Sequence, residues 1–565
     1  MQLKNNVFRP KLLDVFSNYS WSKFSADLMS GIIVGIVALP LAIAFGIASG
    51  VAPEVGLITA ILGGFIVSLL GGNSVQIGGP TGAFIVIVYG IIEQYGLDGL
   101  IIATLIAGVL LLLMGFLRLG TLIKFIPYPI VVGFTAGIAI TIFSTQINDL
   151  FGLGIHNVPG NFIGKWQVYI QEFSKIDFVA MGFGLGSILI IMLTPFVSKK
   201  IPGSLISIIL LTVLAYFLRQ SGVEGIETIG DRFTISTNIP TPHLPKIDLA
   251  TIQALFPSAF TIALLGAIES LLSASVADGV TGDRHRSNTE LIAQGAANIV
   301  VPFFGGIPVT GAIARTMTNI NNGGRTPVAG LIHAVVLLLI LLFLGPLMDF
   351  IPMACLAGVL VIVSYNMSGW RSVLSICKGD KGGMLVMAIT FFLTVLLDLT
   401  VAIEIGLLIA MLIFMKRVTE TTNIVVSKEK LTLKREDDVV QSNESEDELV
   451  LPKGVEVYEI NGPYFFGIAN RFEEAMDIVG DKPKVRIIRM RKVPFMDSTA
   501  VHNLSSLIMT CRKDNVKIIL SGVRQELRET LAKGGIEEMI GKENICSHIH
   551  LAVERAEEVV NNNNK

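Results

Sequence analysis

Charged residues and cysteines are both scarce in this sequence. Of its 565 residues, 16% are charged and 52% are hydrophobic, whereas an ordinary soluble protein carries about 25% charged residues. A formal net charge of −2 leaves no basic surplus for binding nucleic acid. No two cysteines stand at CxxC or metal-ligand spacing, so we expect reduced, structural thiols and no metal site. The cysteines are Cys355, Cys377, Cys511 and Cys546.

The sequence also lacks a nucleotide-binding loop and a cleavable signal peptide. Gly541-Lys542-Glu543 resembles the end of a phosphate-binding loop, but no glycine stands five residues before it and Glu543 replaces the required Ser or Thr. Residues 1–27 are polar, and the apolar run that follows has no cleavage-type end. We therefore expect neither an ATP-driven pump nor an enzyme, assign no catalytic residue and expect no cofactor.

Long apolar runs, by contrast, are abundant between residues 28 and 415. Because a membrane span needs about 20 apolar residues, we predict roughly fourteen segments. The first seven lie near 28–48, 52–71, 81–94, 98–117, 127–147, 176–195 and 203–218, and the second seven near 256–277, 287–304, 310–320, 327–346, 351–366, 383–398 and 400–415. The expected domains are an N-terminal segment 1–27, a transmembrane transport domain 28–417 with repeats at about 28–218 and 256–415, a linker 418–450, an α/β domain 451–560 and a polar tail 561–565.

The distribution of Lys and Arg favours one orientation. The breaks after even-numbered segments contain Arg118, Lys124, Lys199, Lys200, Arg284, Arg286, Arg325, Arg371, Lys378 and Lys381. The breaks after odd-numbered segments have their basic residues in two long loops, which count for less. Since positive charge stays inside the cell, we expect both termini to be cytoplasmic and the protein to lie in a bacterial inner membrane.

Short strings in the first half recur in the same order in the second half. Leu69–Gly72 corresponds to Phe303–Gly306, Thr81–Ala83 to Thr310–Ala312, and Phe125–Pro127 to Phe350–Pro352. Each half contains an odd number of segments, so the second half must enter the membrane upside down. Inverted repeats with short, Gly/Pro-interrupted segments are typical of secondary transporters whose binding site lies near the midplane.

The two segments that open at Thr81 and Thr310 are too short to cross a membrane alone. Pro80 and Pro308 stand at these breaks, where a missing N–H group costs little. A helix that begins inside the membrane has unpartnered N–H groups and a positive dipole end, so two facing starts can bind an anion. The alternative, that both are kinks packed tightly for structural reasons, stays open. Pro40 is expected to break the first span near its middle.

Glu269 is the acidic residue that we expect deep in an apolar span. A charge at that depth is costly and usually marks an ion or substrate path. Burial favours the protonated carboxyl, so Glu269 could bind and release a proton, with Ser273 one turn later on the same face. The alternative is a neutral glutamate satisfied by neighbouring backbone. Arg315, expected at the cytoplasmic end of the tenth segment, either attracts the anion or extends to the interface.

Strand and helix alternate after the charged linker. Strands are predicted at Val455–Ile460, Val485–Met490 and Val516–Ser521, and helices from Ala469, Thr499 and Gln525. This alternation predicts a small α/β layer. Asp497 and Ser498 stand at a helix start, where both residue types serve as caps.

Together these strings resemble the SulP family, the bacterial relatives of the animal anion carriers of solute carrier family 26. The matching strings are Asp27–Ala42, Gly78–Ala83, Gly266–Leu272 and Pro308–Asn319, and the C-terminal part resembles a STAS domain. The resemblance implies an all-α polytopic fold of seven-plus-seven inverted repeats in core and gate domains, an elevator-like movement and a homodimer. It also implies ion coupling by Glu269 with Ser273. It makes Ser498 a regulatory position, at the place where relatives that regulate sigma factors are phosphorylated. The expected anion-binding residues are Thr81, Gly82, Ala83, Thr310, Gly311, Ala312, Ala42 and Arg315.

The anion and the coupling ion follow from finer features of the resemblance. Sodium-dependent bicarbonate members have Asp with Thr one turn later, whereas Glu269 and Ser273 are similar to the proton-coupled branch. His156–Pro159 and Tyr365–Ser368 are similar to C4-dicarboxylate carriers of the family. We expect proton-coupled symport of sulfate or a C4-dicarboxylate; sodium-coupled bicarbonate transport and uncoupled exchange or channel activity remain alternatives. Expected partners are the anion, a proton, membrane lipid, a second copy and a cytoplasmic protein bound by the STAS domain.

Overall fold

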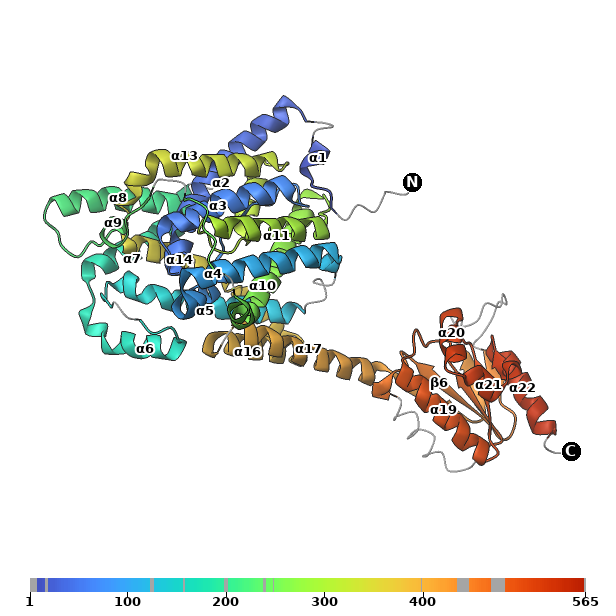
Figure 1. Ribbon diagram of the computed structural model, residues 1–565. Coiled ribbons are helices and arrows are strands. Elements are labelled where there is room, and N and C mark those ends of the chain that lie inside the picture. The colour runs from blue at the N-terminus through green and yellow to red at the C-terminus, as the bar shows by residue number, and fades with distance from the viewer. Residues whose placement is uncertain are drawn as a thin grey trace. The chain divides into compact units, whose positions relative to one another are not determined.

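The computed structural model of the chain describes residues 8–15, 19–121, 127–155, 158–197, 202–236, 240–246, 248–397, 399–433, 447–468 and 483–562 (Figure 1). The expectations for Phe125 and Ile126, for His156 and Asn157, and for a helix from Ala469 lie outside these described residues. The chain divides into two compact units, Met1–Ala410 and Met411–Lys565.

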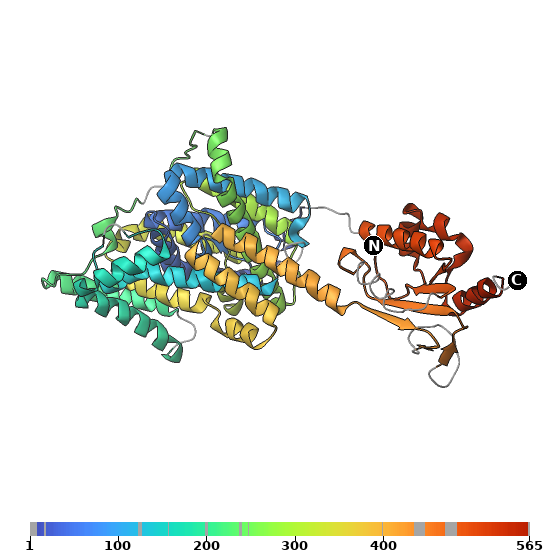
Figure 2. The same cartoon turned by 90° about the horizontal axis from the view of Figure 1, so that it is seen from below.

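The first unit is a bundle of helices (Figure 2). Its first half contains α1 (Leu12–Val15), α2 (Trp21–Ala48), α3 (Pro53–Leu70), η1 (Gly82–Phe84), α4 (Ile85–Phe116), η2 (Leu119–Thr121), α5 (Tyr128–Phe151), α6 (Phe162–Gln171), η4 (Phe173–Lys175), α7 (Phe178–Val197), α8 (Gly203–Gln220) and α9 (Ile229–Arg232). Its second half contains α10 (Leu249–Thr281), α11 (Ser287–Phe303), α12 (Ile313–Asn321), α13 (Val328–Met348), α14 (Met353–Met367), α15 (Trp370–Lys378), α16 (Lys381–Leu396) and the start of α17 (Leu399–Thr421).

Every predicted segment overlaps one of these helices. Within the described residues, nine helices are long and apolar enough to cross a membrane. The predicted segments 81–94 and 98–117 are joined as η1 and α4, which bend at Gly96, where φ is 68°. A residue without a Cβ adopts a positive φ without strain, so Gly96 separates two helices that meet at a kink, in agreement with the two predicted segments. The nine-residue α12 confirms that the tenth segment is short.

Helix α2 continues through Pro40, and the predicted break in the first span is therefore wrong. Pro40 is buried together with Ala38 and Ala42, and α2 packs against α3 and α13. A proline removes only one hydrogen bond from the helix ladder. The packing on both sides holds the remaining turns in line.

Close helix contacts join elements that are distant in the sequence. Helix α11 packs on α3 and α4, α13 packs on α2 and α3, and α14 and α16 pack on α5. A Cβ on Gly108 of α4 would lie 2.9 Å from the Gly295 carbonyl oxygen of α11. The absence of a side chain at these two positions lets the backbones approach closely, as in other membrane helix pairs.

The second unit is built on one five-stranded sheet. The strand order is β3 (Asn423–Ser427), β6 (Val455–Asn461), β7 (Val485–Arg489), β8 (Lys517–Ser521) and β9 (Ile545–Cys546). The pair β3–β6 is antiparallel and the other pairs are parallel. A separate two-stranded sheet pairs β4 (Lys430–Leu433) with β5 (Asp447–Val450). The expected linker 418–450 therefore contains the end of α17 and strands of this unit.

Helices cover both faces of the five-stranded sheet. The remaining elements are α19 (Ser498–Lys513), α20 (Gln525–Lys533), α21 (Ile536–Ile540), η5 (Lys542–Asn544) and α22 (Ile549–Asn562). One apolar cluster joins the sheet to α19, α20 and α21, and another joins it to α22. Figure 1 shows β6 between α19 and α22. The predicted α/β layer is confirmed.

Candidate functional site

Two extended segments meet inside the helix bundle. Strand β1 (Gly78–Gly79) pairs antiparallel with β2 (Thr310–Gly311), with Gly78 opposite Gly311. The Ala312 amide continues the pairing by donating to the Ile77 carbonyl at 3.0 Å. Each strand leads directly into a short helix, so the two interrupted segments predicted from the sequence lie side by side.

Glycines are required at this crossing because side chains from elsewhere fill the space around it. A Cβ on Gly79, whose φ is +152°, would lie 2.1 Å from Nη1 of Arg315. A Cβ on Gly311 would lie 1.8 Å from Nε2 of Gln76. Both distances are far below van der Waals contact, so any side chain at either position would displace a buried polar group.

The helical segments begin slightly later than predicted. The first starts at Gly82 and the second at Ile313, because Thr310 and Gly311 are extended and paired. The amide of Gly311 already donates to Oγ of Ser270 at 3.2 Å. The free first-turn amides of the second helix therefore begin at Ile313, which is exposed together with Ala314. A helix start of this kind, open to an approaching ligand, favours an anion.

Thr81 and Glu269 contact each other directly. Oγ1 of Thr81 donates to Oε2 of Glu269 at 2.9 Å. The two residues come from different parts of the chain, the first helix break and the middle of α10. Both keep part of their surface accessible, whereas the neighbouring Gly82 and Ala83 are buried. The carboxyl of α10 thus lies at the first helix start.

The second break is tied to α10 by hydroxyl groups. Oγ1 of Thr310 donates to the Gly266 carbonyl at 3.0 Å and lies 2.8 Å from Oγ of Ser270. Ser273 donates to Oγ1 of Thr316 at 3.3 Å, and Thr316 accepts from the Ile77 amide. Ser273 is thus bonded towards α12 rather than towards Glu269.

Arg315 lies in the first turn of α12 and not at its cytoplasmic end, which corrects the expected position. Its side chain is 2% exposed, so it does not extend to an interface. Nη2 donates to the carbonyl of Pro80, and Nη1 has no hydrogen-bond partner among the described residues. The guanidinium therefore lies beside Gly79 and Pro80, behind the first break.

The first span approaches the site through Phe45 rather than Ala42. Ala42 is completely buried, and its carbonyl faces Gly56 of α3, where a Cβ would lie 2.0 Å away. A Cβ on Gly82 would meet Phe45 of α2 at 3.6 Å. Phe45 carries no pattern in the sequence that separates it from other apolar residues of the span.

The same glycine faces two further helices. A Cβ on Gly82 would also lie 3.2 Å from Cδ1 of Ile142 in α5 and 3.2 Å from Sδ of Met367 in α14. Gly82 therefore lies where the interrupted segments meet α5 and α14, on a surface of apolar side chains.

A buried acidic residue of α11, Glu290, was missed from the sequence. It is 0% exposed and accepts hydrogen bonds from the Gly72 amide and from the side-chain amides of Gln76 and Gln294. Glu290 stands three residues after the start of α11, in a polar stretch that resembles an exposed helix end. Gln294, one turn later on the same face, is the signal that could have revealed it.

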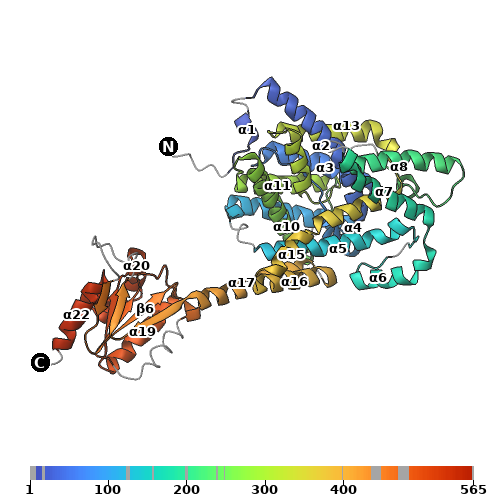
Figure 3. The same ribbon diagram turned by 180° about the vertical axis from the view of Figure 1, so that it is seen from behind.

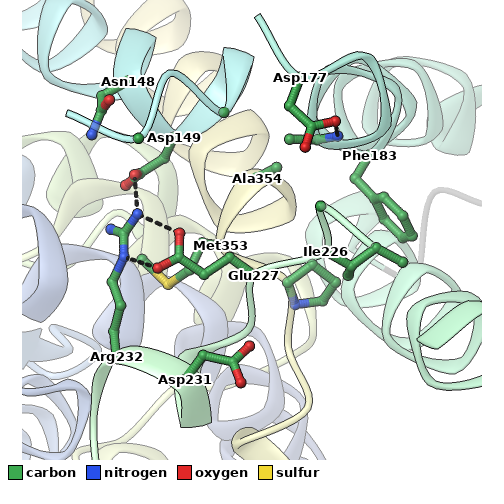
Figure 4. A pocket seen from close by; sticks show the side chains of 15 residues that line it. Asn148, Asp149, Asp177, Phe183, Ile226, Glu227, Asp231, Arg232, Met353 and Ala354 are labelled. Carbon is green, nitrogen blue, oxygen red and sulfur yellow. Dashed lines mark hydrogen bonds and ion pairs between the residues drawn. The ribbon is translucent and has the colours of Figure 1, made fainter. Parts of the chain in front are cut away.

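A separate pocket lies among α5, α7, α9 and α14. Its volume is about 380 Å³, and none of the predicted site residues lines it. Arg232 crosses it and donates to Asp149 at 2.7 Å and to Glu227 at 2.6 Å (Figure 4). Burial alone would raise the pKa of Asp231, but hydrogen bonds from the Thr228 amide and from Arg219 hold that pKa below its usual value. These ion pairs connect the loop before α9 to α5.

In the second unit, Asp497 caps α19. One carboxylate oxygen accepts from the Ala500 amide at 2.8 Å and the other from the Phe466 amide at 3.0 Å. Ser498 is the exposed first residue of the helix. Its hydroxyl is accessible to a modifying enzyme, and the capping role of Asp497 is independent of it.

Two paired helix breaks within an apolar bundle are typical of membrane transporters. The fold matches that of the murine Slc26a9 anion transporter in the inward-facing state, with a TM-score of 0.86 and 18% identity over 97% of this chain and 94% of that chain. It also matches the transmembrane domain of a cyanobacterial bicarbonate transporter, BicA, with a TM-score of 0.61 and 31% identity over 69% of this chain and 98% of that one.

The chain belongs to the sulfate permease family. The model of that family matches residues 24–390, and a STAS domain matches residues 448–556. The chain is 40% identical to the putative sulfate transporter YvdB of Bacillus subtilis, over 94% of this chain and 98% of that protein. It is 31% identical to the bicarbonate transporter BicA of a Picosynechococcus species, over 92% of each. The protein is thus a multi-pass membrane anion transporter with a C-terminal STAS domain, and not an enzyme.

Proposed function

We propose that the protein is a proton-coupled symporter for sulfate or a C4-dicarboxylate in the bacterial inner membrane. The observation that carries this proposal is the 2.9 Å hydrogen bond from Thr81 to Glu269. It joins a residue at the first helix break to the carboxyl group of α10. The group that would bind the cargo, the Thr81 hydroxyl, therefore donates its proton in a hydrogen bond to the group that would bind the coupling ion, the Glu269 carboxylate.

The anion is expected between the starts of η1 and α12. The first-turn amides of both helices, together with the Thr81 hydroxyl, supply neutral donors there. The buried guanidinium of Arg315 adds a positive charge behind them, since its Nη2 bonds to the Pro80 carbonyl. Gly82 lets the anion approach the backbone because it carries no side chain.

Coupling follows from the single hydroxyl proton of Thr81. When Glu269 is ionised, it repels the anion and holds this proton. When Glu269 is protonated, the repulsion ends and the Thr81 hydroxyl is released to donate to the anion. Protonation and anion binding therefore favour each other, which is the requirement for symport.

The loaded site then moves as a body. The atoms nearest to a Cβ on Gly82 belong to apolar side chains of α2, α5 and α14, and a neutral Glu269 crosses such a surface at far lower cost than an ionised one. An elevator-like step of the interrupted segments past α5 and α14, within a homodimer with cytoplasmic termini, completes the proposed cycle. Ser273 supports it by holding Thr316 of α12 beside α10.

Two other functions compete with this one. The 31% identity to a bicarbonate transporter favours bicarbonate as the cargo. In the sodium-coupled form of this alternative, the same carboxylate would bind sodium. Uncoupled exchange or channel activity would need no titratable group at the helix break, so the Thr81–Glu269 contact counts against it. The STAS domain is assigned a regulatory role, through phosphorylation of Ser498 or a cytoplasmic protein partner.

Uptake into proteoliposomes tests the proposal. Radiolabelled sulfate, succinate and bicarbonate would be supplied in turn, with an inward proton gradient, an inward sodium gradient or neither. We expect concentrative uptake of sulfate or succinate with the proton gradient alone. Concentrative bicarbonate uptake that requires sodium would replace the proposal with its first alternative, and equal uptake without any gradient would replace it with exchange.

A further inference from the structure

Helix α15 is a short helix of the first unit. It follows α14, precedes α16 and packs against α5 and α16 (Figure 3). Its nine residues span about 14 Å, whereas the hydrocarbon core of a bilayer is about 30 Å thick. Because it connects the ends of two apolar helices, it lies where the bilayer surface must be.

The helix has three distinct faces. Residues three or four apart share a face, and the inward face is half-buried, with Ser372 accepting from the Tyr128 hydroxyl at 2.8 Å. The second face is apolar and open, and consists of Trp370, Leu374 and Cys377, of which Trp370 is 45% and Leu374 48% exposed. The third face is exposed and basic, and consists of Arg371, Ser375 and Lys378.

We propose that α15 binds the headgroups of acidic phospholipids. The apolar face would enter the acyl boundary, and the adjacent basic face would contact lipid phosphates. Arg371 and Lys378 form no ion pair among the described residues; Arg371 lies over the Trp370 ring, 5.4 Å from its centroid. An apolar stripe flanked by basic residues is the pattern of a helix that lies in the membrane interface.

The geometry favours a lipid surface over a protein partner. The apolar face is only one residue wide, and the basic face lies beside it rather than around it. A planar boundary between acyl chains and headgroups matches two adjacent stripes of this kind. Each basic residue near an acidic membrane surface strengthens association by roughly fivefold, so Arg371 and Lys378 together would contribute more than tenfold.

Cys377 provides a direct probe of this face. It is exposed, whereas the other three cysteines are buried, so an environment-sensitive thiol-reactive fluorophore should label the full-length chain at this position alone. We would reconstitute the labelled protein in nanodiscs of phosphatidylcholine with and without phosphatidylglycerol. Emission should shift to the blue in both, and further with phosphatidylglycerol. The double variant Arg371→Gln, Lys378→Gln should abolish only the phosphatidylglycerol-dependent part.

A matched control and a label-free measurement complete the test. Neutralising Arg512 and Lys513, an exposed basic pair on α19, should leave the shift unchanged. Uptake by the unlabelled protein should depend on phosphatidylglycerol, and less so in the Arg371→Gln, Lys378→Gln variant. Three results would overturn the proposal: emission like that in water, a blue shift that does not depend on phosphatidylglycerol, or a blue shift that grows with protein density. The third result would show that the apolar face binds a second copy of the chain.

Discussion

The shared proton between Thr81 and Glu269 makes a quantitative prediction about anion affinity. At high pH, an ionised Glu269 holds the Thr81 hydroxyl proton in the 2.9 Å hydrogen bond. Glu269→Gln replaces the carboxylate by a neutral amide of the same size, and should release this donor to the anion. Thr81→Val removes the donor altogether, and Thr81→Ser keeps it.

The size of the effect follows from the kind of hydrogen bond. A bond to a charged group contributes about 1.5–3 kcal/mol and a neutral one about 1 kcal/mol. Glu269→Gln should therefore strengthen anion binding by about 0.5–2 kcal/mol at high pH, roughly two- to thirtyfold. In a Thr81→Val background the donor is absent, so this part of the gain should vanish. The gain in affinity that remains in this background comes from the loss of charge repulsion. Comparing the single variants with the double variant separates this contribution from that of the hydrogen bond.

The assay is equilibrium binding of radiolabelled anion to the purified protein at pH 8.5 and pH 5.5. Wild type, both single variants, the double variant and Thr81→Ser would be compared. We expect the Glu269→Gln gain at pH 8.5 only, and Thr81→Ser should behave as wild type. Equal gains from Glu269→Gln with and without Thr81→Val would refute the shared proton, even if the carboxyl still couples transport by repulsion alone.

Three further outcomes are expected. Gly311→Val should weaken anion binding at least tenfold, because its Cβ would overlap the Gln76 amide, whereas Gly279→Val, with open space around it, should bind normally; equal binding would contradict the close crossing. Asp231→Asn should lower the melting temperature at neutral pH. The pKa of Asp231 is lowered in the folded protein, so its ionised form stabilises the fold above the ordinary carboxyl pKa, and this stabilisation is lost as the pH falls. If wild type and variant differed in melting temperature as much at pH 3 as at pH 7, this explanation would be contradicted. A chain ending at Arg417 should still bind anion, measured as above, and loss of binding in a folded truncation would give the STAS domain a direct role.

Local patterns were sufficient to predict the two interrupted segments. Proline and glycine act on the residues beside them, so Thr81 and Thr310 mark helix starts within three residues of those observed. Glu269 was found for a similar reason, since a carboxyl group stands out in an apolar run. Its contact with Thr81 is compatible with the predicted role but was not deducible, because it joins residues that lie far apart in the chain.

Long-range packing accounts for what the sequence did not reveal. The pairing of β1 with β2 depends on partners more than two hundred residues apart, and it moved the start of α12 from Thr310 to Ile313. Pro40 was given its ordinary helix-breaking role, but α3 and α13 hold α2 together around it. Arg315 was placed by counting residues along a segment, whereas its burial is decided by the Pro80 carbonyl of the other repeat.

The position of Arg315 also explains how such a site could release its cargo. A guanidinium in direct contact with a buried anion would form a strong, desolvated ion pair, and a transporter that binds too tightly cannot unload. Arg315 instead donates to a carbonyl, and Gly79 leaves room for its other nitrogen behind the break. In the proposed site, the positive charge would act at a distance, while amides and the Thr81 hydroxyl would make the contacts. These neutral donors are individually weak, and one of them returns to Glu269 as soon as its proton leaves, so deprotonation itself would drive release.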